Sequence, residues 1–241
     1  MTVVIPMAGH GRRFLEAGYK LPKYLLEAHG KTSLEWSVDS LPIELADVLI
    51  FVALREHERD YQIESRIRDL YGHRSSLAFF FLDQVTGGQA ETVMKAAEAI
   101  NPEQPLIIFN IDTMFSSPTL KGNLLRDDVD GVLGSFPSEE PRFSFAATDE
   151  AGYATLVTEK EAISKNALTG LYHFRRAGDF MDVASEAIKN NLLMKGEFYV
   201  APLYNTLIER GARFILDPAP VHHILGTPGE YEAFASLNPA P

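Results

Sequence analysis

The chain has 241 residues, of which 46% are hydrophobic and 23% charged, and its formal net charge is −11 at pH 7. These values argue against disorder, and the length is enough for one large domain with its own core. Acidic residues outnumber lysine plus arginine by 33 to 22 without any basic block, which argues against a nucleic-acid partner. There is no cysteine, which excludes disulfides, zinc thiolates and thiol nucleophiles.

Membrane and secretory segments are not expected either. No apolar run approaches the ~20 residues that span a bilayer, and the N-terminus lacks a basic region followed by a long apolar stretch. We therefore expect a cytoplasmic protein with no membrane partner. In a chain this acidic, an anionic substrate would have to be attracted by local cations.

Residues 3–23 have the features of a phosphate site. Residues 3–5 predict a buried strand that ends at Pro6, which cannot donate a ladder hydrogen bond. A turn of small residues follows, where backbone N–H groups can approach an anion, and then come cations that can neutralise a phosphoryl group. The small residues are Ala8, Gly9 and Gly11, and the cations are Arg12, Arg13, Lys20 and Lys23.

Two more familiar phosphate motifs are incomplete. The dinucleotide motif G-x-G-x-x-G would need a glycine at position 14, which is Phe14. The tripeptide Gly30-Lys31-Thr32 resembles the end of a P-loop, but the first glycine of that motif would fall on Leu25. We interpret Gly30-Lys31 as a turn between two apolar runs.

The first half of the chain alternates between strands and helices. Continuous apolar runs at residues 48–53, 77–82 and 106–109 predict strands covered on both faces, and residues 56–71 and 89–100 have helical spacing. This order predicts an α/β fold with three layers, α/β/α, and a mainly parallel sheet. Ligands of such sheets lie beyond the carboxyl ends of the strands, so the glycine turn, residues 84–88 and Asp112 should meet at one cleft.

The pattern changes after residue 129. Short strands are expected at residues 132–136, 143–147, 153–158 and 167–174, which predicts an inserted antiparallel lobe. Helices at 179–189 and 198–210, strands at 213–216 and 222–225, and a frayed end at 238–241 follow. We expect a single domain over residues 1–241, with a core at about 1–128 and the lobe and a closing segment at about 129–236.

Five segments in order resemble one enzyme family. Gly9-His10-Gly11-Arg12-Arg13-Phe14, followed by Pro22-Lys23, resembles the G-x-G-x-R-F…P-K signature of the sugar-phosphate nucleotidyltransferases, or nucleoside-diphosphate-sugar pyrophosphorylases. The other segments are Gln84 with Gly88-Gln89-Ala90, Asn110-Ile111-Asp112, Val157-Thr158-Glu159-Lys160 with Ser164 and Thr169-Gly170-Leu171-Tyr172, and Gly226-Thr227-Pro228. Together they span residues 2 to about 234, nearly the whole chain.

The resemblance implies nucleotidyl transfer from a nucleoside triphosphate to a phosphorylated sugar or a similar small phosphate, with release of pyrophosphate. It also implies the nucleotide-diphospho-sugar transferase fold, Mg²⁺ as cofactor, a nucleotide-binding core, an acceptor-binding lobe and a possible homo-oligomer. The acceptor phosphate would attack the α-phosphorus directly, which suits a chain without a thiol nucleophile.

The resemblance also implies roles for individual residues. Arg13 and Lys23 would be catalytic cations, because a guanidinium can grip a phosphate through two bonds and an ammonium adds a point charge. We interpret Arg12 as a solvated surface residue. Ala8, Gly9, Gly11, Gln84 and Gly88 would bind the nucleotide, Asp112 would bind the metal, and Glu159, Lys160, Gly170, Glu197 and Tyr199 would bind the acceptor. The amide of Gln84 would not by itself distinguish uracil, thymine or cytosine.

The metal site departs from the family pattern. Many relatives carry a second metal-binding aspartate two residues before Gly-Thr-Pro, where this chain has Ile224. His222 and His223 are adjacent on an expected strand, so they should face opposite sides and would not easily bind one ion together. Asp112 with substrate oxygens could suffice, because Mg²⁺ needs only one or two protein carboxylates. A turn or N-cap role for Asp112 is the structural alternative.

Two other functions remain open. A glycosyltransferase of similar architecture would use a nucleotide sugar and typically bears a D-x-D motif, of which Asn110-Ile111-Asp112 is only half. A regulatory module could keep the nucleotide pocket without chemistry, as the change at Ile224 suggests. Pyrophosphate release would separate the enzyme expected here from both.

Overall fold

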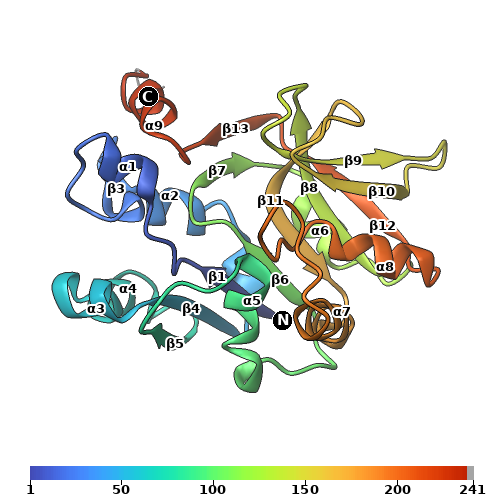
Figure 1. The fold of residues 1–241 in the computed structure, drawn as a ribbon, viewed down its shortest axis with the longest axis horizontal. Coiled ribbons are helices and arrows are strands. Elements are labelled where there is room, and N and C mark those ends of the chain that lie inside the picture. The colour runs from blue at the N-terminus through green and yellow to red at the C-terminus, as the bar shows by residue number, and fades with distance from the viewer. Residues whose placement is uncertain (238–241) are drawn as a thin grey trace.

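Nine strands form one sheet within residues 1–237, the part of the chain that the computed structural model describes (Figure 1). They are β1 (Thr2–Pro6), β4 (Val48–Leu54), β5 (Ser76–Leu82), β6 (Leu106–Phe109), β8 (Gly131–Pro137), β9 (Ser144–Thr148), β10 (Ala154–Glu159), β11 (Asn166–Phe174) and β12 (Phe214–Pro218). The main order is β10-β9-β11-β6-β1-β4-β5, and β8 pairs with β11 and β12. The frayed end expected at residues 238–241 lies outside the described residues.

The centre of the sheet is parallel. Strands β6, β1, β4 and β5 run in one direction, and Val4 of β1 lies opposite Ile50 and Ile108. Strand β11 runs antiparallel to β6 and carries the sheet on into β8, β9 and β10, while β12 is parallel to β8. The predicted mainly parallel α/β sheet with antiparallel additions is confirmed. The segment after residue 129 extends this one sheet.

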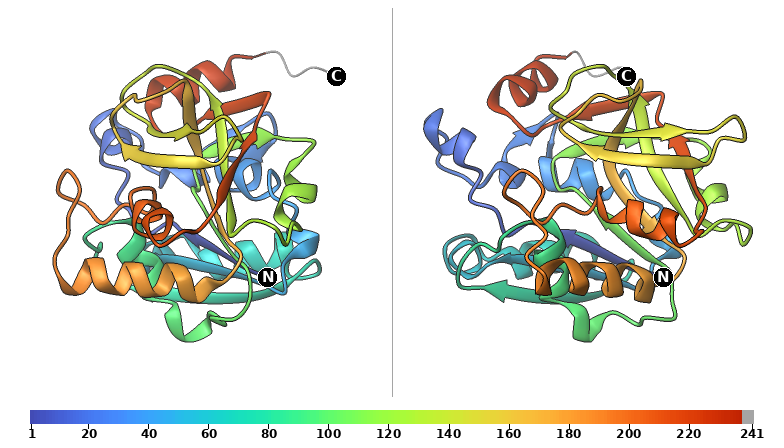
Figure 2. Two further views of the ribbon diagram at one scale, coloured as in Figure 1. Left: turned by 90° about the vertical axis from the view of Figure 1, so that its right-hand side faces the viewer. Right: turned by 45° about the vertical axis from the view of Figure 1, so that its right-hand side comes forward.

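Helices cover both faces of the sheet (Figures 1 and 2). The helices of residues 1–237 are α1 (Arg12–Glu16), α2 (Ser33–Val38), α3 (Arg55–Tyr61), α4 (Ile63–Tyr71), α5 (Gln89–Met94), α6 (Leu120–Leu124), α7 (Ala177–Lys189), α8 (Leu203–Glu209) and α9 (Pro228–Ala235). Residues of α2, α4 and α6 pack on one face, and residues of α5, α7 and α8 pack on the other.

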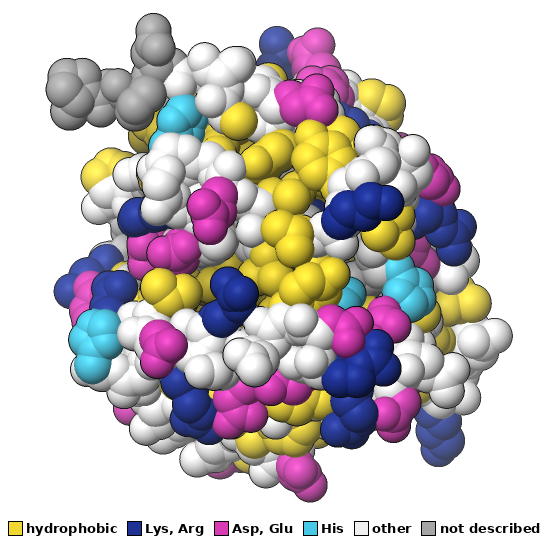
Figure 3. All heavy atoms as spheres, turned by 90° about the vertical axis from the view of Figure 1, so that its left-hand side faces the viewer, with side chains coloured by type: hydrophobic (Ala, Val, Ile, Leu, Met, Phe, Trp, Pro, Cys, Tyr) yellow, Lys and Arg dark blue, Asp and Glu magenta, His cyan; other side chains and the backbone are white. Residues whose placement is uncertain are grey.

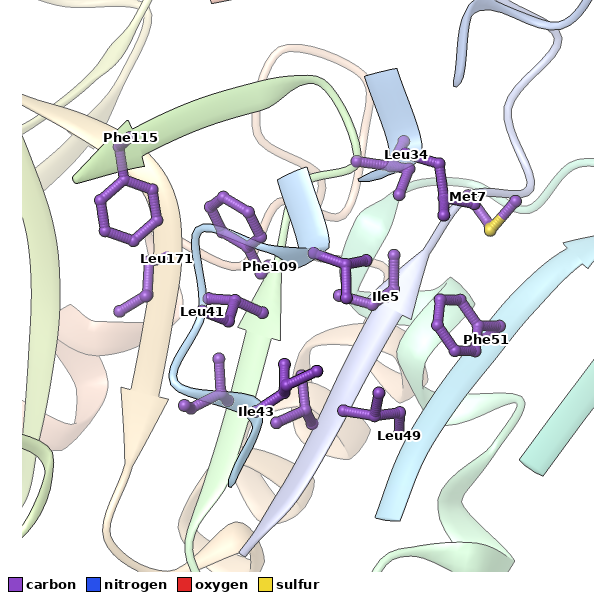
Figure 4. Packing of buried hydrophobic residues seen from close by; sticks show 14 of the residues in the cluster. Ile5, Met7, Leu34, Leu41, Ile43, Leu49, Phe51, Phe109, Phe115 and Leu171 are labelled. Atoms are coloured by element: carbon purple, nitrogen blue, oxygen red, sulfur yellow. The ribbon is translucent and has the colours of Figure 1, made fainter. Parts of the chain in front are cut away.

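The core follows the alternation of side chains along each strand. Ile5, Phe51 and Phe109 point to the same face, where they meet Leu34 of α2 (Figure 4). The three strand residues are fully buried, and burying one such side chain stabilises the fold by about 1.5–3 kcal/mol. Because both faces are covered, the strands read as unbroken apolar runs in the sequence.

Two helices are shorter than their periodicity predicts. The helix expected at residues 56–71 is broken at Gln62, whose left-handed backbone (φ 53°) separates α3 from α4. The helix expected at 89–100 ends at Met94 and continues only as a 3₁₀ turn, η3 (Ala97–Ala99).

The helix predicted at residues 198–210 begins later, with α8 at Leu203. The N–H of Phe198 donates to the carbonyl of Gly87 at 2.9 Å, and its own carbonyl accepts from the N–H of Ala90 at 2.9 Å. These bonds hold Phe198 against a distant loop, so it cannot take part in a helix. Pro202 then precedes α8, where a missing N–H costs nothing.

Short elements complete the fold. The turn predicted at Gly30-Lys31 is confirmed as a hairpin between β2 (Glu27–Ala28) and β3 (Lys31–Thr32), with φ 54° at His29 and 76° at Gly30. A second antiparallel pair joins β7 (Thr113–Ser116) to β13 (Val221–Ile224). Two 3₁₀ turns, η1 (Lys23–Leu25) and η2 (Ile43–Leu45), lie in the first third of the chain.

The surface view adds the charge distribution. On the face in Figure 3, lysine and arginine side chains lie between acidic ones, around a band of hydrophobic side chains. Within residues 1–237, each helix falls short of the length and apolar character that crossing a membrane requires.

Candidate active site

Two adjoining hollows lie beyond the carboxyl ends of β1 and β6. The first, of about 720 Å³, is lined by the turn after β1, the loop after β5 and the end of β6. The second, of about 760 Å³, is lined by the loop before β9, part of β11 and the segment from Ile224 to Glu230. Eight residues line both, and we call them the shared wall: Gly11, Arg12, Arg13, Lys23, Asn110, Asp112, Glu197 and Tyr199.

The glycine turn after β1 is open where an anion could approach. Ala8 is buried, whereas Gly9 is exposed and no atom lies within 4 Å of the position that a Cβ would take. Gly11 has φ 62°, a left-handed conformation that glycine adopts without strain, and it starts α1. The turn therefore presents backbone and carries the chain into the two arginines.

Arg12 and Arg13 are both exposed on the shared wall, and neither forms an ion pair within residues 1–237. The sequence predicts a solvated surface position for Arg12. It is exposed, but it lines both hollows beside Arg13. The wall therefore offers two adjacent guanidinium groups that no protein carboxylate neutralises.

Asp112 and Lys23 line the same two hollows as these arginines and form an ion pair. Lys23 Nζ lies 2.5 Å from Asp112 Oδ2, and the side chains of Lys23 and Asp112 are 24% and 20% exposed, respectively. The backbone carbonyl of Asp112 accepts from the N–H of Leu225 at 2.7 Å, which ties the end of β6 to the closing segment.

The donor set here fits Mg²⁺ only together with oxygens of a ligand. Within residues 1–237, the side chains of His, Asp and Glu do not form a group of three or more that could enclose a metal. Asp112 is a single carboxylate, and Ile224 lies in β13 opposite Thr113, the residue after Asp112. Magnesium commonly takes one or two carboxylates and completes its octahedron with phosphate oxygens and water.

The two histidines before Ile224 face opposite sides of β13, as predicted. The ring of His222 lies 4.3 Å from that of Phe136, and the ring of His223 lies 5.0 Å from that of Phe234. Burial lowers the pKa of both histidines. They are packing residues of the closing segment and do not converge on one point.

Asn110 is positioned from two sides. Its Oδ1 accepts from Gln89 Nε2 at 2.6 Å. Behind it, Gly170 has φ +85°, and a Cβ at that position would lie 2.2 Å from Asn110 Nδ2. Gly170 does not line either hollow, so its place in the site is to let Asn110 lie close to β11.

The loop after β5 contributes different residues from those expected. Gln84 is exposed and lies outside both hollows, whereas Val85, Thr86 and Gln89 line the first one. Gly88 lines it too and passes so close to Phe198 that a Cβ would lie 2.4 Å from the Phe198 nitrogen.

The acceptor residues expected from the resemblance are divided between the hollows. Glu159 is 7% exposed, lines the first hollow and accepts a hydrogen bond from Ser144, and burial raises the pKa of its carboxyl. Lys160 lines the second hollow and donates to the hydroxyl of Tyr199, which donates to Glu197 at 3.0 Å. Burial raises the pKa of Tyr199, so its phenol keeps the proton that it donates.

Comparison with known proteins decides the family. No protein-family profile matches the chain, and no curated protein matches it. A solved structure described as the nucleoside-diphosphate-sugar pyrophosphorylase from Vibrio cholerae RC9 is 32% identical, with a TM-score of 0.84, over 98% of this chain and 100% of that one. This chain belongs to that family.

More distant pyrophosphorylase-like structures have the same fold. One is a putative glucose-1-phosphate thymidylyltransferase from Bacillus anthracis (17% identity, TM-score 0.78, 100% of this chain and 97% of that one). Another is the inositol-1-phosphate CTP transferase from T. maritima (12%, TM-score 0.75, 98% and 94%). The family and fold predicted from the five segments are confirmed.

The second hollow of this family member contains a pair that sequence reasoning missed. Arg142 forms an ion pair with Glu230, although 88 residues separate them. The guanidinium lies 4.2 Å from the ring centre of Phe143, and Glu230 also accepts from Thr227 Oγ1 at 2.7 Å. Thr227 with Glu230 three residues later is a capping signature that the sequence does display, whereas nothing local marks Arg142.

Proposed function

We propose that this pyrophosphorylase-family chain transfers a nucleotidyl group from a nucleoside triphosphate to a phosphorylated sugar or a similar small phosphate, with release of pyrophosphate. The observation that carries the proposal is the shared wall, where Arg12, Arg13, Lys23 and Asp112 lie between two hollows. Each hollow has the volume of an ordinary small-ligand site. Two ligands that fill them would bring their phosphates together at these charged groups.

In this proposal the first hollow binds the nucleotide, and we call it the nucleotide hollow. The backbone from Ala8 to Gly11 would face the triphosphate, and the residues from Val85 to Thr92 would surround the base. The second is the acceptor hollow, where Lys160, Glu197 and Tyr199 would bind the acceptor. Glu159, expected from the sequence to bind the acceptor, lies in the wall of the nucleotide hollow.

The reaction needs no covalent intermediate. An oxygen of the acceptor phosphate attacks the α-phosphorus, and a new P–O bond forms there. The bond from the α-phosphorus to the oxygen that bridges to the β-phosphorus breaks, and its electron pair leaves with pyrophosphate. Arg13 and Lys23 would neutralise the charge on the transferring group, and the two hollows would hold the reactants in line.

Asp112 would hold Mg²⁺ together with phosphate oxygens and water. The bound ion would neutralise charge on the phosphate oxygens. Lys23, which pairs with Asp112 in the structure, would then turn its ammonium group toward the substrate. The single carboxylate supports a metal that arrives with the nucleotide.

Pyrimidine triphosphates are the expected donors. The names of two of these structural neighbours specify thymidylyl and CTP chemistry, both with pyrimidine bases. The cytoplasmic location, the homo-oligomer and the division into a core and a lobe remain predictions from the sequence.

A panel of triphosphates and phosphorylated sugars and polyols, assayed for pyrophosphate with Mg²⁺, tests the proposal. We expect release with at least one pyrimidine triphosphate and one acceptor. Nucleotide binding without pyrophosphate release from any pair would instead favour the regulatory module that the change at Ile224 suggests.

A further inference from the structure

Helix α3 contacts the segment that carries Lys23 and helps to hold it in place. Tyr24 OH and His57 Nδ1 share a hydrogen bond of 2.8 Å, and Tyr61 OH donates to the carbonyl of Lys20 at 3.1 Å. His10 of the glycine turn lies 3.6 Å from Glu56 of the same helix. Helix α3 thus contacts the glycine turn and the segment that leads to Lys23 at separate points.

The contact between Tyr24 and His57 is buried, unlike the others. Tyr24 is 1% exposed and His57 is 9% exposed. Burial raises the pKa of Tyr24 and lowers the pKa of His57, so a protonated phenol faces a neutral imidazole. A buried hydroxyl that lost this partner would have no water to replace it, so the hydrogen bond fixes both side chains.

Tyr24 belongs to η1, the turn whose first residue is Lys23. The turn is closed by the N–H of Leu25, which donates to the carbonyl of Pro22 at 2.8 Å, and by that of Leu26, which donates to the carbonyl of Lys23 at 3.3 Å. Because the turn is short, the position of the buried Tyr24 side chain fixes the position of the Lys23 backbone, from which the lysine side chain extends.

Lysine has a long side chain with several rotatable bonds, and within residues 1–237 the ammonium group of Lys23 is held by its ion pair with Asp112. In the proposed reaction Asp112 would hold Mg²⁺, and this contact with Lys23 would then be lost. The buried hydrogen bond between Tyr24 and His57 does not face the cleft, so it remains when that contact is lost.

We propose that Tyr24 and His57 are positioning residues that hold the Lys23 turn against α3 and so aim the lysine at the transferring phosphate. This inference rests on the proposed function, in which Lys23 neutralises that phosphate. Neither Tyr24 nor His57 lines either hollow, so the inference assigns their effect to the position of the Lys23 turn.

Tyr24→Phe tests the inference because it removes the hydroxyl and keeps the ring. Tyr204→Phe is the matched control: Tyr204 is also fully buried, and its hydroxyl donates to the His173 carbonyl at 3.1 Å, away from both hollows. We expect Tyr24→Phe to lower kcat about tenfold with little change in the KM of the triphosphate, since small misplacements of a catalytic group are costly. The control should lose similar thermal stability and keep its kcat.

A second variant makes the test specific for Lys23. In a Lys23→Ala background, Tyr24→Phe should cause no further loss of kcat, because the group that it positions is gone. The same fractional loss in both backgrounds would overturn the inference. His57→Asn, whose side-chain oxygen can accept from Tyr24, should keep more activity than His57→Ala.

Amide hydrogen exchange supplies a readout that does not depend on turnover. Tyr24→Phe should speed exchange at Leu25 and Leu26, the two amides that close the turn, and Tyr204→Phe should not. Unchanged exchange at both amides would overturn the inference whatever the kinetics show. If the unmodified protein releases no pyrophosphate in the panel, the proposed function fails, and the exchange data still decide whether Tyr24 holds the turn.

Discussion

The two hollows of the cleft are built in different ways. The nucleotide hollow includes backbone that turns at the ends of strands, where Gly9 has open space beside it and Gly88 lets the loop pass close to Phe198. The acceptor hollow is formed by long side chains that bind one another across large sequence distances, such as Lys160 to Tyr199 and Arg142 to Glu230. The shape of the nucleotide hollow thus depends on the path of the backbone. The shape of the acceptor hollow can change with single side chains while the fold stays the same.

This contrast suggests where the family would vary. Backbone at the end of a parallel sheet can contact the phosphates of any nucleoside triphosphate, because every such donor carries them. The acceptors differ from one another, and a wall of interchangeable side chains suits that variety. Substitutions should therefore affect the shared wall most, then the nucleotide hollow, then the acceptor hollow.

The largest effect is expected at the shared wall, because its residues line both hollows. Arg13→Ala should lower kcat by about 10²–10³-fold, because it removes a charged contact that is strongest in the transition state. Stability should change little, since the side chain is exposed. Steady-state kinetics measure kcat, and thermal unfolding checks that the variant is folded. Unchanged turnover in a folded variant would remove Arg13 from the mechanism.

Asp112→Asn should come next and act on the nucleotide side. We expect Mg²⁺ to bind weakly to the free protein and to strengthen nucleotide binding about tenfold or more, because phosphate oxygens complete its shell. Calorimetry should show that Asp112→Asn loses most of this strengthening, and that Ile224→Asp gains metal affinity if its carboxylate reaches the site.

Tight Mg²⁺ binding to the nucleotide-free protein would contradict this arrangement. Asp217 of β12 could not replace the missing aspartate, because it is fully buried and accepts hydrogen bonds from Thr119 and Asn123. Protein groups other than Asp112 would then have to bind the ion.

Gly88→Ala should damage the nucleotide hollow alone. The added methyl would collide with the Phe198 backbone, so the loop must move, and we expect the KM of the triphosphate to rise about tenfold with the KM of the acceptor unchanged. Gly122→Ala is the control, because a Cβ there meets no atom within 4 Å. An equal rise in both KM values would show that the loop serves both hollows.

Arg142→Ala should damage the acceptor hollow alone and more mildly. We expect the KM of the acceptor to rise about three- to tenfold, as for the loss of one partly exposed charged hydrogen bond, with the triphosphate unaffected. Arg126→Ala, which breaks a comparable exposed pair with Asp128 outside the cleft, should leave both KM values unchanged. A higher KM for the triphosphate would contradict the division.

The smallest effect concerns Glu159. Because burial raises the pKa of its carboxyl, the folded state favours the protonated form, and this contribution to stability is lost as pH rises through the raised pKa. Glu159→Gln stays neutral and can keep the bond to Ser144, so its Tm should exceed that of the unmodified protein near pH 8 and approach it near pH 4. Thermal unfolding across that range tests the sign.

Much of the fold could be predicted because the strands are continuous apolar runs and each helix has a visible period. One error lies in a local backbone conformation, and another has a tertiary cause. Gln62 adopts a left-handed backbone and splits one helix, and Phe198 leaves its expected helix because it bonds to Gly87 and Ala90. No local propensity reports a hydrogen bond to a segment more than a hundred residues away.

The same division holds for the cleft. The sequence by itself determined the cluster from Ala8 to Lys23 and the place of Asp112, because neighbours along the chain and the ends of parallel strands are fixed by local geometry. Only the tertiary structure left Gln84 outside, brought Arg12 onto the wall, placed Glu159 on the nucleotide side and joined Arg142 to Glu230. These outcomes depend on how loops pack against distant elements, and the free energy of that packing is not written in any short stretch of sequence.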